Sequence, residues 1–136
     1  MIQKLKEIIE SVTQAKVFIA DRGEMNILAD ELKAFESFVQ IVPSYRKELF
    51  FDKRKWEKGT IRVYFSRFVP LECSDEILYK AKNDLEDEIV LPLFAALKYN
   101  NFMRCVSWHI DYSVPPLYDA HEATILVEID LQQPIC

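Results

Sequence analysis

The last third of the chain alternates between apolar and polar residues with the two-residue period of a half-buried β-strand. Most apolar side chains fall on even positions between Phe102 and Tyr112, and on odd positions between Ala123 and Leu131. We expect two antiparallel neighbouring strands joined by a long connection, residues 113–122. A sheet with one apolar face needs a second layer to cover that face, so the chain must fold as a layered structure.

Two segments have the helical spacing that could supply this second layer. The N-terminal helix is predicted from apolar residues three and four positions apart, namely Ile2, Leu5, Ile8, Ile9 and Val12. A long helix should begin after Ser74, a good N-cap, with Asp75 and Glu76 at the positive end of the helix dipole. Its apolar stripe continues to Leu97, and Pro92 is expected to kink it.

Further strands are predicted at Lys16–Ala20, at Phe38–Val42, which Pro43 ends, and at Thr60–Phe68. We expect the segment Leu49–Asp52 to continue the second of these strands across a turn, and Met25–Leu32 is interpreted either as a helical turn or as a short strand. The fold class is therefore α+β, with the order α-β-β-β-α-β-β. We expect a largely antiparallel sheet with the N-terminal helix and the long helix packed on one face.

Length and composition agree with one globular domain spanning residues 1–136, since 50% of the residues are hydrophobic and 29% are charged. No apolar run approaches the roughly 20 residues of a membrane-spanning helix, and the N-terminus alternates charge where a signal peptide would be apolar. Cys73, Cys105 and Cys136 are far apart and form no CxxC pair, which favours free thiols in a reducing compartment. We expect synthesis in the cytoplasm.

Charge is divided unevenly along the sequence. Between Ser44 and Arg67 there are eight basic and three acidic residues, a balance of +5, which leaves −10 for the rest of a chain whose total is −5. A basic patch on an acidic body can bind nucleic acid, or it can dock on the acidic face of an identical neighbour in a ring.

The sequence contains none of the common catalytic or cofactor-binding motifs. With only two glycines it has no P-loop, dinucleotide-binding turn or nucleophile elbow. Cys105 lies four residues, or ~13 Å along a strand, from the nearest candidate base, His109. A metal site could be assembled only from side chains around the long connection: His109, Asp111, Asp119 and His121. We predict no cofactor, no metal and no enzymatic activity.

The best candidate for a contact surface is the segment Asp52–Lys58, where basic side chains surround a tryptophan. Tryptophan and arginine are enriched at interface hot spots, and the same residues could stack on a base and neutralise phosphates. The long connection is a second candidate, because its two prolines would stiffen it. The predicted partner-contact residues are Lys53, Arg54, Lys55, Trp56, Lys58, Pro115, Pro116 and Tyr118.

Several stretches resemble a known group of proteins. They are Tyr118-Asp119-Ala120-His121, the closing Gln133-Pro134-Ile135-Cys136, the run from Val17 to Asp30, and Leu93-Phe94-Ala95-Ala96-Leu97. The chain is similar in these stretches to small tail-morphogenesis proteins of phages and prophages infecting Bacteroidetes. The resemblance implies a head–tail connector, tail-terminator or tail-completion subunit that forms homo-oligomeric rings and has no turnover.

We therefore expect a structural virion protein whose partners are other copies of itself and neighbouring phage structural proteins. Exposed strand edges, the connection 113–122 and the basic segment Asp52–Lys58 should make the contacts. Two rival hypotheses remain: a nucleic-acid-binding accessory protein that uses the basic residues of segment 53–67, or a small metal-dependent enzyme built around His109, Asp111 and His121.

Overall fold

A computed structural model describes residues 1–21, 35–51, 55–70, 74–115 and 122–135 of the chain. In this described part the chain forms a helix, four strands, a long helix and two strands. Their bounds are α1 Ile2–Thr13, β1 Lys16–Ile19, β2 Ser37–Ile41, β3 Lys47–Phe51, β4 Lys55–Phe68, α4 Asp75–Leu85, η1 Glu86–Val90, α5 Leu91–Lys98, β5 Arg104–Asp111 and β6 Glu122–Pro134.

The strands form one sheet in the order β1-β2-β4-β6-β5, and β3 also pairs with β4. Only β1 and β2 run parallel among these pairs; the others are antiparallel. The long strands β4 and β6 form the centre, paired from Trp56 opposite Pro134 to Phe68 opposite Glu122. β2 and β3 lie one after the other along the same side of β4, because Pro43 interrupts what would otherwise be one strand.

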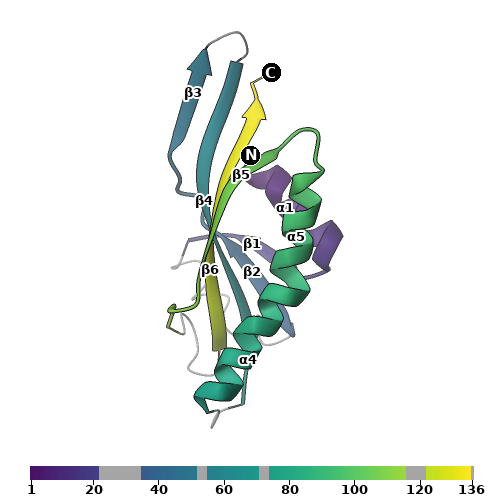
Figure 1. Cartoon of the computed structure of the whole chain (residues 1–136), viewed down its shortest axis with the longest axis vertical. Coiled ribbons are helices and arrows are strands. Elements are labelled where there is room, and N and C mark those ends of the chain that lie inside the picture. Colours follow the sequence, from purple (N-terminus) through teal and green to yellow (C-terminus); the bar gives the residue numbers. More distant parts are fainter. Residues whose placement is uncertain (22–34, 52–54, 71–73, 116–121, 136) are drawn as a thin grey trace.

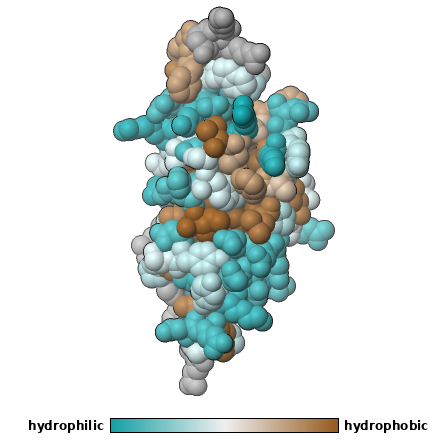
Figure 2. Space-filling model, in the orientation of Figure 1, coloured by the Kyte–Doolittle hydropathy of each residue, from teal (hydrophilic) through white to brown (hydrophobic). Residues whose placement is uncertain are grey.

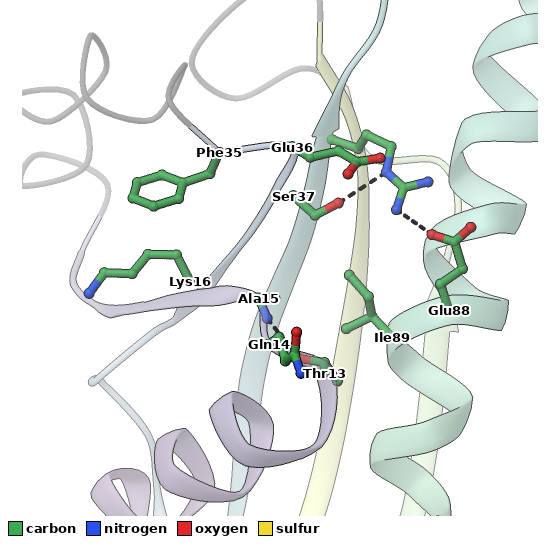
Figure 3. Close-up of a pocket in the computed structure, with 10 residues that line it drawn as sticks. Thr13, Gln14, Ala15, Lys16, Phe35, Glu36, Ser37, Glu88 and Ile89 are labelled. Atoms are coloured by element: carbon green, nitrogen blue, oxygen red, sulfur yellow. Dashed lines mark hydrogen bonds and ion pairs between the residues drawn. The ribbon is translucent and has the colours of Figure 1, made fainter.

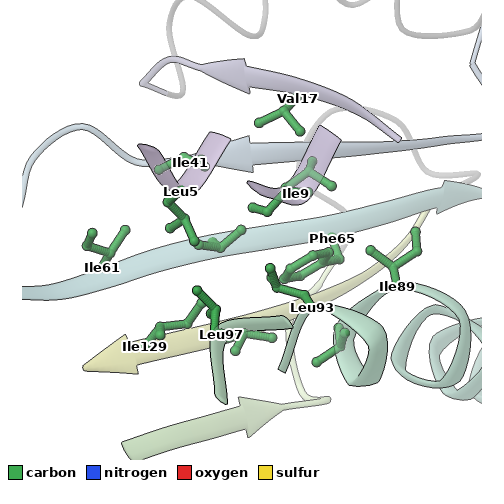
Figure 4. Close-up of a cluster of buried hydrophobic side chains, with 14 of the residues drawn as sticks. Leu5, Ile9, Val17, Ile41, Ile61, Phe65, Ile89, Leu93, Leu97 and Ile129 are labelled. Atoms are coloured by element: carbon green, nitrogen blue, oxygen red, sulfur yellow. The ribbon is translucent and has the colours of Figure 1, made fainter. Parts of the chain in front are cut away.

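Both helical segments pack on one face of this sheet, as Figure 1 shows. Leu5 and Ile9 of α1 are fully buried, and Leu93 and Leu97 of α5 pack into the same core. Figure 4 shows these side chains converging on the sheet between the two helices. The sheet contributes alternate residues, with the two-residue period of strands, from β1, β2, β4 and β6: Val17, Val39, Ile41, Ile61, Val63, Phe65, Ile125, Val127, Ile129 and Leu131.

The long helix begins and changes geometry where the sequence indicates. The Ser74 hydroxyl accepts a hydrogen bond from the Ile77 amide at 3.3 Å, which caps α4. A kink is predicted at Pro92; the structure shows the π-helical turn η1 just before it, in which the Leu91 amide donates to the Glu86 carbonyl. Proline cannot donate and crowds the carbonyl four residues before it, so the wider turn relieves that contact.

The predicted α+β class with helices on one face is confirmed. The structure has one strand more than the predicted order, since Lys47–Phe51 forms β3 as a separate strand and β4 already begins at Lys55, while Asp52 lies outside the described residues. The alternation predicted for β5 is interrupted by a bulge between Cys105 and Ser107, which leaves Val106 exposed. Met25–Leu32 lies outside the described residues, so neither interpretation of it can be compared with the structure.

Candidate protein-contact surfaces

Strand β3 and residues 55–59 of β4 pair as an antiparallel hairpin that we call the arm, and the end of β6 flanks its β4 strand. In Figure 1 the arm extends past the helical layer at the end of the sheet. An ion pair crosses it, with Lys47 Nζ 3.3 Å from Glu57 Oε2. The amide of Gln133 donates to Glu57. This hydrogen bond and the contact with Lys47 lower the pKa of Glu57. The contact with Glu57 in turn raises the pKa of Lys47. The arm is thus a defined structure.

Every residue of β3 is exposed, although three consecutive ones are large and apolar. Leu49 is 53% exposed, Phe51 is 69% exposed, and Phe50 lies between them. Because side chains alternate along a strand, this run places apolar groups on both faces of the arm. Exposed apolar groups on an edge strand usually mark a surface that another chain covers.

The predicted contact residues are divided between two places. Lys55, Trp56 and Lys58 belong to the arm, whereas Pro115 follows the far end of β5, about 23 Å along that strand from Arg104. Lys53, Arg54, Pro116 and Tyr118 lie outside the described residues. The structure therefore does not bring Pro115 to the basic segment.

Trp56 is half-buried and faces a neighbour that the sequence reasoning missed. It is paired with Phe50 across the arm, and both line a hollow of about 350 Å³ together with Arg104 and Gln132. The run Leu49-Phe50-Phe51 next to the charged segment could have indicated this neighbour, but we interpreted the run only as part of a strand.

A second polar cluster bridges the three strands β4, β6 and β5. The carboxylate of Asp130 accepts hydrogen bonds from the hydroxyls of Thr60 and Ser107. Burial raises the pKa of Asp130, but these two bonds and the nearby Lys58 outweigh it, and the net pKa is lowered. A carboxylate held in this way is a weak base, so the cluster is suited to holding strands together.

Of the residues considered for metal or nucleophilic chemistry, the structure describes His109, Asp111 and Cys105. His109 is exposed opposite Glu128, and Asp111 accepts two hydrogen bonds from Ser113, which lower the pKa of its carboxyl group. Within the described ranges no group of three or more histidines, cysteines and acidic residues could hold a metal ion, and Asp119 and His121 lie outside those ranges. Burial raises the pKa of the half-buried Cys105 thiol, which disfavours the reactive thiolate.

A polar hollow of about 350 Å³ lies between the end of α1, the start of β2 and the π-helical turn (Figure 3). Arg67 occupies it, donating to the Ser37 hydroxyl at 3.0 Å and pairing with Glu88. These bonds tie the end of β4 to β2 and to the helical layer. The guanidinium of Arg67 is therefore used for contacts within the domain.

The outer side of α5 and the adjoining strand β5 carry a second exposed apolar surface, which we call the helix–β5 patch. On α5 it consists of Leu91 and Phe94, which are 47% and 40% exposed. Phe94 also contacts Trp108 of β5 edge to face, with ring centroids 5.2 Å apart, so helix and strand form one surface. Figure 2 shows hydrophobic surface at mid-height of this side of the molecule and at the end where β3 lies.

Neither a protein-family model nor a curated protein matches the sequence. Among the described residues, no helix is long and apolar enough to cross a membrane.

Proposed function

We propose that the chain is a structural subunit that acts by association with other copies of itself. The observation that carries this proposal is the arm, whose strand β3 exposes Leu49, Phe50 and Phe51 along an outer edge. Among the described strands β3 pairs with β4 alone, so its other edge is available for a neighbouring chain. Covering such an edge with a second copy removes apolar surface from water and satisfies backbone groups.

The particular assembly that we propose is a ring in the neck or tail of a phage: a head–tail connector, tail terminator or tail-completion ring. The tail-morphogenesis resemblance described above supports the phage assignment, and it implies a place in the virion with neighbouring phage structural proteins as further partners. An α+β subunit with a projecting arm, whose outer strands β3 and β5 each pair with one strand among those described, is suited to repeated contacts of this kind. The role is structural, without turnover.

Nucleic acid is the less favoured partner. Arg62 stands opposite Glu128 in the register of β4 and β6, and Lys58 lies near Asp130. On the other face of the arm, Lys47 is bonded to Glu57. These internal partners reduce the net positive charge that phosphates would meet. The hollow beside Trp56 and Arg104 is the one described feature that favours base stacking, so DNA binding at low salt belongs in the test.

The proposal is tested by sedimentation of the purified protein and of the double variant Leu49→Ser/Phe51→Ser. Both side chains are more than half exposed, so the free energy of unfolding of the variant should differ from that of the wild type by less than about 0.5 kcal/mol. We expect the wild type to sediment as an oligomer and the variant as a monomer. Val12→Ser, which removes an exposed apolar side chain from α1, is the control and should assemble normally.

A wild type that stays monomeric, or a double variant that assembles as well as the wild type, would refute the role of the arm. DNA binding that weakens steeply with salt and is lost in Lys55→Glu/Lys58→Glu, in an otherwise monomeric protein, would favour the nucleic-acid hypothesis instead.

A further inference from the structure

The helix–β5 patch combines an apolar surface with a free strand edge. Among the described strands β5 pairs only with β6, so its outer edge is open beside the patch. Leu91, at the start of α5, is 47% exposed, and Phe94, one helical turn further on, is 40% exposed. A chain seated here could contact both the helix and the backbone of the strand.

The arm has the complementary features. It presents an apolar edge strand of five residues, while β5 has eight, so the whole of β3 could lie along it. In the sheet, β3 lies on one side of the central pair and β5 on the other. The two edges of one molecule therefore face away from each other, and a contact between them requires a second molecule.

Charge points to the same pairing. The arm and the residue before it carry four basic residues, Arg46, Lys47, Lys55 and Lys58, against two acidic ones, Glu48 and Glu57. The helix that leads into the patch, α4 with η1, is acidic: Asp75, Glu76, Asp84, Glu86, Asp87 and Glu88 outnumber Lys80 and Lys82. Opposite fields of this kind orient approaching chains and disfavour contact between like surfaces.

We infer that the arm of each copy docks on the helix–β5 patch of the next copy, with β3 along the open edge of β5 and the basic arm beside the acidic turn η1. The inference rests on the proposed function and names its contact. Because arm and patch are different surfaces, the contact is head-to-tail, which closes into a ring when the rotation between copies divides a full turn.

Two variants that each lack one surface test this inference. Leu49→Ser/Phe51→Ser removes the apolar arm but keeps the patch, while Leu91→Lys keeps the arm and places a positive charge in the patch. The lysine stands four residues after Asp87, which favours the helix. Native mass spectrometry should show each variant alone as a monomer, and their equimolar mixture as a one-to-one dimer of twice the 16.0 kDa chain mass.

The dimer is the decisive product. One variant supplies the only intact arm and the other the only intact patch, so the pair can form one contact and no third molecule can bind to it. A mixture that stays monomeric while the wild type assembles overturns the inference and leaves the proposed function standing. A wild type that is itself monomeric overturns the proposed function as well.

The control is Ile77→Lys, which adds the same charge at a similarly exposed apolar position of α4, roughly 21 Å along the helix from Leu91. It should assemble like the wild type, and a loss equal to that of Leu91→Lys would overturn the assignment of the patch. In chains whose own cysteines are replaced by alanine, Phe51→Cys and Leu91→Cys should form disulfides with each other. Disulfides of Phe51→Cys only with itself would show an arm-to-arm contact and overturn the inference.

Discussion

At the scale of single residues, Asp130 joins three strands through the hydroxyls of Thr60 and Ser107. In Asp130→Asn one of these hydroxyls would meet an amide group that cannot accept its proton, so we expect a loss of about 1–2 kcal/mol in the free energy of unfolding. Urea denaturation at pH 7 measures it. Glu128→Gln on the same strand and face should change stability by less than about 0.5 kcal/mol, and equal losses in both variants would contradict this role.

The same carboxylate predicts an acid sensitivity. Its pKa in the folded chain lies below the ordinary value of 3.8, so the unfolded chain binds the proton more readily. The stabilisation is complete above the unfolded pKa and is lost as the pH falls through the folded pKa. The difference between wild type and Asp130→Asn should therefore narrow below about pH 4. A difference that stays constant between pH 7 and pH 3 would contradict the charge-dependent bonds.

Gly59 lies at the base of the arm, where there is no room for a side chain. A Cβ at this position would stand 2.9 Å from Met1 Sδ and 3.0 Å from Cε2 of the Tyr45 ring. We expect Gly59→Ala to cost about 1–3 kcal/mol through overpacking. Thermal or urea unfolding measures the loss, and Tyr45→Ala in the same chain should recover part of it, whereas additive losses would show that the two side chains do not meet.

At the scale of the elements, Lys82 of α4 fixes the chain that leaves β5. Its buried ammonium donates to the carbonyls of Tyr112 at 2.6 Å and Val114 at 3.3 Å, and burial lowers its pKa. Lys82→Met leaves these carbonyls unpartnered, so we expect faster amide hydrogen exchange in residues 112–114. Exposed Lys80→Met on the same helix is the control, and unchanged exchange in Lys82→Met would show that the bonds do not hold this segment.

The elements were predictable where a local pattern decides them. The alternation of residues 123–131, the stripe of α1 and the cap at Ser74 each depend on neighbours within a few positions, and each is confirmed. The bulge that exposes Val106 was not predictable, because it is set by the register against β6. The start of β4 at Lys55 was missed for another reason: Lys55 pairs with nearby Phe51, but the charged residues of this stretch lack the apolar alternation of a strand.

At the scale of the whole molecule, the sequence indicated only part of the candidate surfaces. Lys55, Trp56 and Lys58 were selected from their residue types and do lie on the arm. The helix–β5 patch was not predicted, because the apolar stripe of the long helix was assigned to residues such as Ile89, Leu93 and Leu97, and Leu91 and Phe94 beside it were not considered as a surface. Only the packing of α5 against β5 shows that these two side chains stay outside the core.

The division of charge predicts how assembly should respond to salt. If the basic arm meets the acidic turn η1 of a neighbour, raising the salt from 0.1 M to 1 M shortens the screening length from about 10 Å to about 3 Å and should weaken association. Sedimentation at both salt concentrations measures the shift, and the charge-reversed Asp87→Lys should weaken assembly already at 0.1 M. Stronger assembly of Asp87→Lys at low salt would contradict this charge pairing.

The most direct test of association as the role of this protein is native mass spectrometry of the wild-type chain. It should show one discrete oligomer whose mass is a fixed multiple of 16.0 kDa, as a closed ring requires. A species of 16.0 kDa alone, at every protein concentration and in both low and high salt, would contradict it.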